Sequence, residues 1–400
     1  MNNVLVVLIT IICLFILFNR KLRSSSIWHA TVTPLASIIG SGFLVSAPLL
    51  VYATGQMAPV VMLVIVIYAY ALGSSVRFNI LHLEPQLANE SLPPLIKDIE
   101  VLSRPILGLA YFISVAFYLK LLSAFIFRGA GVHQILMEKS LTTAILTFIG
   151  LVGRFRGLKM LEWFEIYSVN TKLAIISTII ISLIVFNIVE LQEGSWLLQS
   201  TSHESLTFSI RQVLGMLIII QGFETSRYLG EDYSAEVRIK TMKYAQWISG
   251  VIYIVFVGLS IIVFNDIKSI SETSIIDIGH IIAPIMPALL IIAAVMSQFS
   301  AAIADTIGGG GLISETFNKF INTKQSYLLL TLIAIALTWL TNIYEIITIA
   351  SKAFALYYTL QVLLTVLLKK NMGYPYLSRL GYQLLALTLI LIVIFGLQVE

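Results

Sequence analysis

Residues 33–48 read TPLASIIGSGFLVSAP, and this stretch decides how the rest of the chain is interpreted. It lies inside an apolar run long enough to cross a bilayer, yet it carries Pro34, Gly40, Gly42 and Pro48. In a helix interior, glycine costs about 1 kcal/mol relative to alanine, and proline costs about 3 kcal/mol. These residues therefore predict a membrane-spanning helix that is broken near its middle.

A second apolar run, at residues 208–228, is interrupted in a similar way by QGFETS at residues 221–226. Unpaired backbone at bilayer depth is tolerated only where it faces protein or a water-filled cavity. Two interrupted segments in corresponding positions of two halves point to the midplane binding site of a transporter. The two breaks together therefore predict such a site.

The composition is that of an integral membrane protein embedded in a lipid bilayer. Of the 400 residues, 58% are hydrophobic and 12% are charged, whereas soluble domains carry about 25% charged residues. The net charge of +4 does not indicate a nucleic-acid partner, because most basic residues fall in loops. The single cysteine, Cys13, excludes an internal disulfide, and the five histidines show no metal-ligand spacing. We therefore expect no cofactor and no metal.

An apolar run of about 17–25 residues can cross the bilayer as one helix, so the number of such runs predicts the number of spans. A first run at residues 3–19 predicts an N-terminal anchor, which we expect to stay uncleaved because no basic residue precedes it. Core spans are predicted after it at residues 28–53, 57–77, 104–130, 140–153, 161–188, 208–228, 243–264, 281–304, 326–341, 344–368 and 379–398. The predicted fold class is all-α, with about 12 transmembrane helices.

The basic residues predict the orientation of these spans, because cytoplasmic loops carry an excess of Lys and Arg. If Arg20, Lys21 and Arg23 are cytoplasmic, most of the 25 Lys and Arg residues fall on that side. We therefore predict a multi-pass protein of the cell membrane, of the bacterial inner-membrane kind, with both termini outside. Of the cytoplasmic loops, residues 78–103 predict either an amphipathic interface segment or a plain connector, and the glycines at 308–311 predict a flexible hinge.

Backbone amides at the first break are the first candidate binding groups. Gly40, Ser41, Gly42 and Phe43 begin a half-helix whose amides are poorly covered by side chains and whose positive dipole end suits a carboxylate. The alternative is close helix packing, because small residues let membrane helices approach one another. The flanking prolines and the second break favour binding.

Two charged residues lie inside predicted spans. An ionised Glu224 at that depth is energetically unfavourable unless the carboxylate is paired or protonated. It is therefore a candidate for binding a cationic group or carrying a proton. Its alternative role is a structural pair with an intramembrane lysine. Lys172, in SVNTKLAIIST, lies too deep to reach water easily, so it is either paired with a carboxylate or neutral. A cation there can take the place of a coupling sodium ion.

Hydroxyl groups in the eighth core span, SQFSAAIADTIGGGG, form a candidate cation site. Ser297 and Ser300 can supply oxygens together with carbonyls freed in the first span, and Asp305 adds a carboxylate near the cytoplasmic end. Alternatively, both serines hydrogen-bond their own helix, as membrane serines often do.

These residues resemble the amino acid–polyamine–organocation (APC) superfamily, whose members share a five-plus-five inverted-repeat fold of the leucine-transporter type. The residues GSGF at 40–43, with Pro48, are similar to the family's first-span glycine motif, which holds the substrate carboxylate. The residues GFE at 222–224 are similar to its sixth-span G-x-E element, where the broken helix meets the substrate amine. Lys172 resembles the fifth-span lysine that fills the place of the second sodium ion in proton-coupled relatives.

The count of apolar spans predicts an anchor span at residues 1–24 and an additional C-terminal span at 371–400, and the resemblance implies a first five-helix repeat at 25–190 and an inverted second repeat at 191–370. It implies a secondary transporter that moves an amino acid or related small amine by alternating access, coupled to protons or acting as an exchanger. The implied substrate-binding residues are Gly40, Ser41, Gly42, Phe43, Gln221, Gly222, Phe223 and Glu224, and the implied ion-coupling residues are Lys172, Glu224, Ser297 and Ser300.

Three alternatives stay open. A sodium-coupled transporter of the same fold would use Ser297 and Ser300, which resemble sodium-coupled members of the superfamily. A channel would need a repeated or symmetric filter element, and the breaks are singular. A polytopic enzyme acting on lipid-linked substrates would need clustered acid and base groups at the membrane surface, for which only His82 with Glu84 is a candidate.

Overall fold

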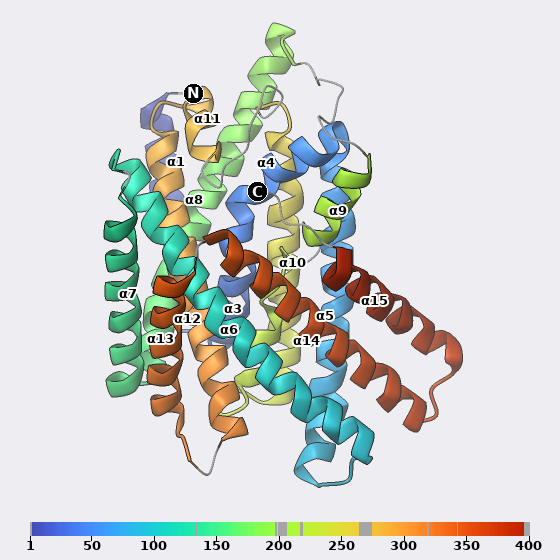
Figure 1. Ribbon diagram of the computed structural model, residues 1–400. Coiled ribbons are helices and arrows are strands. Elements are labelled where there is room, and N and C mark those ends of the chain that lie inside the picture. The colour runs from blue at the N-terminus through green and yellow to red at the C-terminus, as the bar shows by residue number, and fades with distance from the viewer. Residues whose placement is uncertain are drawn as a thin grey trace.

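The computed structural model describes residues 2–132, 134–196, 198, 206–216, 219–263, 274–317, 320–341 and 343–395. Within these residues every regular element is a helix (Figure 1), which confirms the predicted all-α fold. In chain order the elements are α1 (Asn3–Leu17), α2 (Arg20–Arg23), α3 (Ser26–Ile38), α4 (Ser41–Thr54), η1 (Gly55–Met57), α5 (Ala58–Ala88), α6 (Pro94–Gly129), α7 (Ile135–Arg156), α8 (Leu158–Glu193), α9 (Leu206–Met216), η2 (Phe223–Tyr228), α10 (Ala235–Ser260), α11 (Ser274–Ile282), α12 (Met286–Thr316), α13 (Thr323–Leu340), α14 (Ile343–Asn371) and α15 (Tyr376–Phe395).

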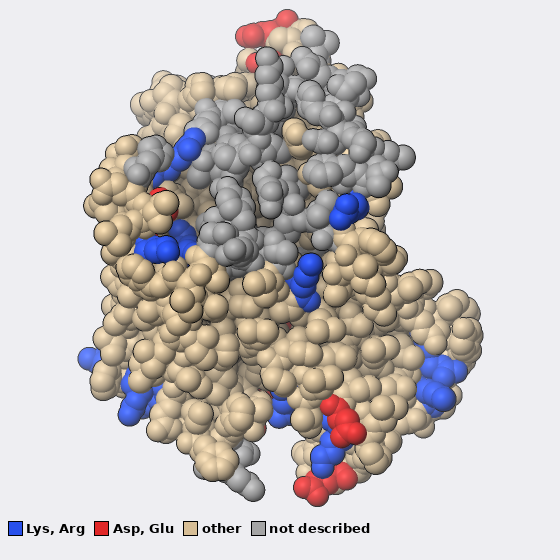
Figure 2. All heavy atoms as spheres, in the orientation of Figure 1, with Lys and Arg blue, Asp and Glu red and all other residues tan. Residues whose placement is uncertain are grey.

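Nine helical segments in the described part of the chain are long and apolar enough to cross a membrane. One of them, Gly42–Ala88, joins α4 and α5, and the shorter apolar helix α1 is a further candidate. The interrupted pairs, α3 with α4 and α9 with η2, account for the two broken spans. Uncharged side chains form most of the visible surface, and the Lys and Arg side chains on it are few and scattered (Figure 2). A largely uncharged surface suits contact with a bilayer.

Helices from the two halves of the core pack against one another in matching pairs. α5 packs against α10, α6 against α12 and α7 against α13. The contact of α6 with α14 has its counterpart in the contact of α12 with α8. The first three pairings join equivalent positions of two five-helix units, and the last two contacts are equivalent to each other, as expected of an inverted repeat. The residue boundaries predicted for the two repeats remain a prediction.

The additional helices at the two ends lie at the periphery (Figure 1). α1 packs against α8, where Asn170 Nδ2 donates a hydrogen bond to the Leu17 carbonyl oxygen at 3.1 Å. At the other end of the chain, α15 packs mainly against α14, and Thr388 lies 2.9 Å from the Tyr68 hydroxyl of α5. α15 also packs against α9, the helix that precedes the second break.

Residues 78–103 do not form the predicted connecting loop, because most of them extend two long helices, and their place at the membrane interface stays a prediction. α5 continues to Ala88 and α6 begins at Pro94, so only a short turn joins two long helices. Proline is well tolerated at a helix start, where its missing amide proton would have no partner. Leu83 and Ile96, one from each extension, are buried in the same apolar cluster. The extensions carry acidic residues into the protein interior.

The glycines at 308–311 do not form a hinge, because they lie within α12 and are buried. A Cβ atom on Gly311 would lie 2.6 Å from the Tyr228 carbonyl oxygen of η2. A Cβ atom on Gly309 would lie 2.6 Å from the Leu330 side chain of α13. Glycine lets neighbouring helices approach this closely, so the run serves helix packing.

Candidate functional site

The first break separates α3 from α4. α3 ends at Ile38, Ile39 is its C-cap, and α4 begins after Gly40, whose backbone has φ −93° and ψ −133°. No side chain of the described residues caps the N-terminus of α4. The first amides of a helix have no partner within it, so α4 presents uncapped amides at the break, as predicted. The side chain of Ser41 lies outside the described residues.

Position 42 has room only for glycine, because the two breaks approach each other there. A Cβ atom at this position would lie 2.8 Å from the Ile219 carbonyl oxygen, which lies in the second break, between α9 and η2. The neighbouring Phe43 is fully buried, and its ring packs 4.4 Å from the ring of Phe256 on α10. Phe43 therefore helps to fix α4 against α10.

Lys172 of α8 binds the end of α3. It is fully buried, and its Nζ atom donates hydrogen bonds to the carbonyl oxygens of Ala36 at 3.0 Å and Ile39 at 2.6 Å. A third hydrogen bond, of 2.8 Å, goes to Ser300 Oγ on α12. In a continuous helix these two carbonyls would accept from amides four residues later. At the break, Lys172 Nζ therefore replaces these amides as the hydrogen-bond donor to both carbonyl oxygens.

Ser300 and Ser297 differ in their relation to Lys172. The Ser300 hydroxyl donates to the Ser297 carbonyl oxygen at 3.1 Å, so it also bonds its own helix. Ser297 Oγ is buried and has no hydrogen-bond partner among the described residues. The structure thus brings Ser300, and not the Ser297 hydroxyl, to the lysine. In the described part of the chain Lys172 has no ion pair with a carboxylate.

The second break rests directly against the first. α9 ends at Met216 and the short helix η2 begins at Phe223. Gly222 has φ +109°, in the left-handed region that favours glycine. A Cβ atom on it would lie 2.5 Å from Ser37 Cβ and 2.8 Å from the Ile38 amide nitrogen of α3. The two interrupted spans therefore meet at one place, as their sequences predict.

Glu224 is fully buried at this meeting point. Its Oε2 atom accepts a hydrogen bond from the Gly222 amide at 2.9 Å and another from the Tyr358 hydroxyl of α14. The Tyr111 hydroxyl of α6 lies 3.5 Å from Oε1. Phe223 stacks on Tyr358 with ring centroids 5.2 Å apart. The carboxylate is thus held by hydroxyls and an amide, and not by the intramembrane lysine of the alternative interpretation.

Asp305 of α12 is a second fully buried carboxylate near the breaks. The Ser37 hydroxyl of α3 donates to its Oδ1 atom at 2.7 Å, and the Ser114 hydroxyl of α6 donates to Oδ2. Ser37 is the residue against which Gly222 packs. Asp305 therefore belongs to the meeting point of the breaks, and the sequence-based placement near the cytoplasmic end of its span is wrong.

Gln221 precedes Gly222 at the same break, and its Oε1 atom is buried without a hydrogen-bond partner among the described residues.

Glu165 is a buried residue that the sequence analysis missed. It is 1% exposed on α8, where its Oε2 atom accepts a hydrogen bond from Thr33 Oγ1 of α3 at 2.8 Å. Its Oε1 atom is buried and has no hydrogen-bond partner in the described part of the chain. Its spacing of seven residues from Lys172 is the signal that could have found it, because that spacing puts both on one helix face.

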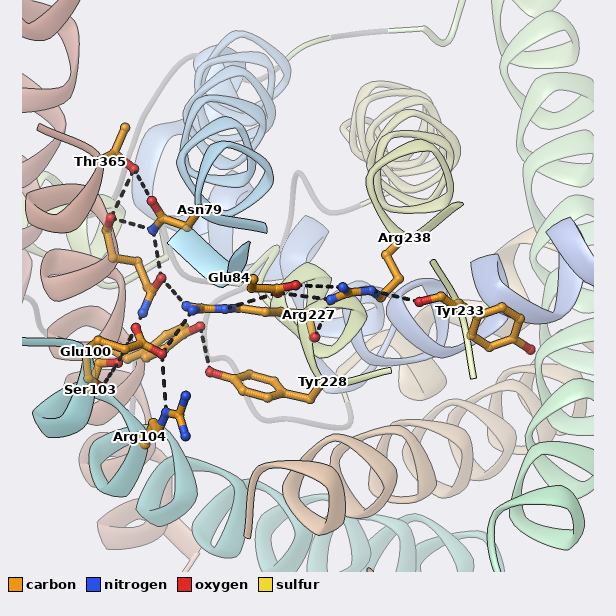
Figure 3. A network of polar contacts seen from close by, with 12 residues as sticks. Asn79, Glu84, Glu100, Ser103, Arg104, Arg227, Tyr228, Tyr233, Arg238 and Thr365 are labelled. Carbon is orange, nitrogen blue, oxygen red and sulfur yellow. Dashed lines mark hydrogen bonds and ion pairs between the residues drawn. The ribbon is translucent and has the colours of Figure 1, made fainter. Parts of the chain in front are cut away.

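A buried charge network surrounds Arg227 of η2 (Figure 3). Its Nη2 atom donates to Glu100 Oε1 of α6 at 3.0 Å, and its Nη1 atom donates to Gln361 Oε1 of α14 at 2.5 Å. Glu84 of α5 lies 3.7 Å from Arg227 Nε and accepts from Arg238 of α10 at 2.7 and 3.0 Å. We call these five residues the Arg227 network.

The Arg227 network ties η2 to four long helices. The Arg227 and Glu100 side chains are only 3% and 1% exposed, so solvent screens their attraction little. Further hydrogen bonds extend the network to Asn79 and Ser103, both bonded to Gln361 (Figure 3). Glu84, which the sequence suggested as a surface acid beside His82, is instead bound within this network.

Comparison with known proteins gives the family of the chain. Residues 20–396 match the family model for APC superfamily transporters. A protein of Aquifex aeolicus (strain VF5), described as uncharacterized, is 44% identical over 404 residues, which cover 98% of this chain and 97% of that protein.

Solved transporter structures share the fold at low sequence identity. A Na⁺-coupled sialic acid symporter in a substrate-bound outward-open state matches with a TM-score of 0.56 and 13% identity, over 99% of this chain and 97% of its own. A manganese transporter of Eremococcus coleocola matches with a TM-score of 0.56 and 12% identity, over 92% and 87%. Mhp1, a nucleobase-cation-symport-1 family transporter in a closed conformation, matches with 0.51 and 13%, over 92% and 91%. These likenesses show the leucine-transporter-type fold alone.

Proposed function

We propose that this chain, which belongs to the APC superfamily of transporters, moves an amino acid or related small amine across the membrane by alternating access. We further propose that transport is coupled to protons or proceeds by exchange, with Lys172 as the titrating group. The observation that carries the proposal is the set of three oxygen atoms around Lys172 Nζ, two of which are carbonyls freed by the first break.

The three oxygens match the chemistry of an ammonium group. A protonated lysine has three N–H donors and no acceptor, and each donor has one partner here. A neutral amine would keep two donors and turn a lone pair toward an oxygen atom. Loss of the proton therefore weakens the link that α8 makes to α3 and α12. Protonation of Lys172 would then bias the equilibrium between two arrangements of these helices.

The two breaks supply complementary groups for an amino acid. The uncapped N-terminus of α4 at Gly40, Ser41 and Gly42 suits the substrate carboxylate. Glu224 and Asp305 suit the amino group, because a buried carboxylate is stabilised by a cationic partner. Both carboxylates accept hydrogen bonds from hydroxyls in this structure. A cationic amine can take over these acceptor positions.

The Arg227 network would act as the closure on the predicted cytoplasmic side. It joins η2, which directly follows the second break, to α5, α6, α10 and α14. Separating a buried ion pair without new partners costs about 3–5 kcal/mol. An opening at this side therefore has to exchange these ion pairs for others or admit water to them.

Sodium coupling is the alternative, and the same oxygens favour it. Carbonyl and hydroxyl oxygens, such as those of Ala36, Ile39 and Ser300, are ligands of hard cations. A sodium ion would need the positions that the Lys172 ammonium binds. A protonated Lys172 and a sodium ion therefore exclude each other at this place.

The first experiment identifies the substrate. The purified protein is screened by thermal shift against amino acids, polyamines and nucleobases, with and without sodium. A ligand at 100 times its dissociation constant stabilises the folded state by about 2.7 kcal/mol, so a true substrate gives a visible shift. A shift with an amino acid or amine in the absence of sodium supports the proposal, and a strict sodium requirement contradicts it.

The second experiment tests proton coupling in proteoliposomes. Uptake of the identified substrate is measured with and without a pH gradient for the wild type, Lys172→Ala and Lys352→Ala. Lys352 is the matched control, because it is an exposed lysine within α14. We expect Lys172→Ala to lose the response to the gradient and Lys352→Ala to keep it. Uptake by Lys172→Ala that still follows the gradient would refute the role of Lys172.

A further inference from the structure

A pocket with basic walls lies where the N-terminal helices meet α8, apart from the two breaks. Its volume is about 220 Å³. One water molecule occupies about 30 Å³ in the liquid, so the pocket has room for a phosphate group and the glycerol that carries it. Its lining residues are Arg20, Arg23, Ser24, His29, Trp163, Ile166 and Tyr167.

The chemistry of the lining selects an anion. Arg20 and Arg23 contribute two guanidinium groups, His29 an imidazole and Ser24 a hydroxyl, and the lining contains no Asp or Glu. Guanidinium groups bind phosphate oxygens through paired N–H donors. Glu162 precedes Trp163 on α8 but does not line the pocket.

Arg23 is held in place and still has a free donor. Its Nη1 atom donates to the Tyr167 hydroxyl at 2.6 Å, and its guanidinium lies 5.5 Å from the centre of the Tyr167 ring. Its Nε atom is buried and has no hydrogen-bond partner among the described residues. An unsatisfied buried donor costs about 1–3 kcal/mol. Because this atom is buried, an anion in the pocket could accept a hydrogen bond from it only after a small shift of the side chain.

The surroundings identify the source of the anion as lipid. The pocket lies at the end of the apolar helix α1, whose side chains Phe15 and Ile16 are 80% and 60% exposed. The rings of Trp163 and Tyr167 pack 4.4 Å apart at the pocket wall. Trp and Tyr are enriched at membrane–water interfaces, and basic pockets between helices on the cytoplasmic side bind anionic head groups. Acyl chains can therefore run along the exposed face of α1.

We propose that this pocket binds the phosphate of an anionic phospholipid from the leaflet on the predicted cytoplasmic side. The lipid would bridge the connection between α1 and α3, through Arg20 and Arg23, to α8, through Tyr167. The α1 helix contacts mainly α8. Bound lipid thus stabilises the docking of α1, whether or not a substrate is present.

The test uses the full-length protein, purified in detergent and stripped of lipid. Its thermal unfolding and native mass spectrum are recorded with phosphatidylglycerol, cardiolipin or zwitterionic phosphatidylcholine. Separate samples receive glycerol 3-phosphate or inorganic phosphate, which distinguish a lipid from a soluble anion. We expect the anionic lipids to bind and stabilise the wild type, and phosphatidylcholine and the soluble phosphates to have no comparable effect. A shift with soluble phosphates alone would overturn the assignment to lipid.

Variants distinguish lipid binding in the pocket from non-specific attraction of anionic lipid to a basic surface. Each basic residue near the surface contributes about a five-fold gain in anionic-lipid binding. Arg20→Gln combined with Arg23→Gln should therefore weaken binding about thirty-fold or more. Lys21→Gln is the matched control, because Lys21 is exposed on α2 between the two arginines and does not line the pocket.

The control decides the outcome even if the double variant folds poorly. The single variant Arg20→Gln changes an exposed residue and should fold, and it should lose more lipid binding than Lys21→Gln does. Equal losses in Arg20→Gln and Lys21→Gln would show a diffuse surface attraction and overturn the pocket.

Discussion

Substitution of Gly222 tests whether the two breaks depend on direct contact with each other. In Gly222→Ala, the new methyl group would lie 2.5 Å from Ser37 Cβ and 2.8 Å from the Ile38 amide nitrogen. Forcing a non-glycine residue into an unfavourable backbone region costs about 1–3 kcal/mol, and overpacking a filled site costs typically about 1–3 kcal/mol. We therefore expect a loss of about 2–6 kcal/mol, together with loss of substrate binding.

Gly194→Ala is the matched control for this substitution. Gly194 also has a positive φ, +71°, at the end of α8, but no heavy atom of the described residues lies within 4 Å of the position that its Cβ would occupy. It therefore carries the backbone cost without the clash, and substrate binding should be unchanged. Thermal unfolding and the ligand-induced thermal shift are measured for both variants. If Gly222→Ala is as stable as Gly194→Ala and binds ligand as the wild type does, the argument for contact between the breaks is refuted.

Three further substitutions address the buried charges. Glu224→Gln should weaken binding of an amine-bearing ligand about ten- to hundred-fold, because a hydrogen bond to a charged group contributes about 1.5–3 kcal/mol; unchanged affinity in the thermal-shift assay would exclude Glu224 from the site. Arg227→Gln should destabilise the protein by about 3–5 kcal/mol, because it leaves the buried Glu100 carboxylate without its buried cationic partner. Arg104→Gln, which removes a 23% exposed partner of the same carboxylate, should cost at most about 1 kcal/mol. Equal losses of thermal stability in the two arginine variants would contradict the central place of Arg227 in the network.

Local features of the chain were enough to predict the membrane spans and the positions of both breaks. Glycine and proline destabilise a helix through their own backbone chemistry, so Gly40, Gly42 and Gly222 indicate where the two spans can be interrupted. The length of an apolar run is likewise set by the thickness of the bilayer. These signals predicted the fold class and put the candidate substrate residues at the breaks.

The same local signals gave wrong predictions where contacts with other helices determine the structure of a segment. α5 and α6 extend beyond the apolar runs because residues of the two extensions, such as Leu83 and Ile96, pack against each other. The glycine run at 308–311 is flexible by composition, but contacts with α13 and η2 hold it within the uninterrupted helix α12. Hydrophobicity and propensity within one segment carry no information about such contacts.

By itself, the sequence determined that the chain crosses the membrane many times and that two of its helices are interrupted, because these properties depend on neighbouring residues along the chain. Only the tertiary structure decided which groups meet. The Lys172 ammonium finds carbonyls more than 130 residues away along the chain, and Arg227 finds Glu100 127 residues away. A buried charge is stable only with its partner. That partner is chosen by helix packing, which local residue preferences do not specify.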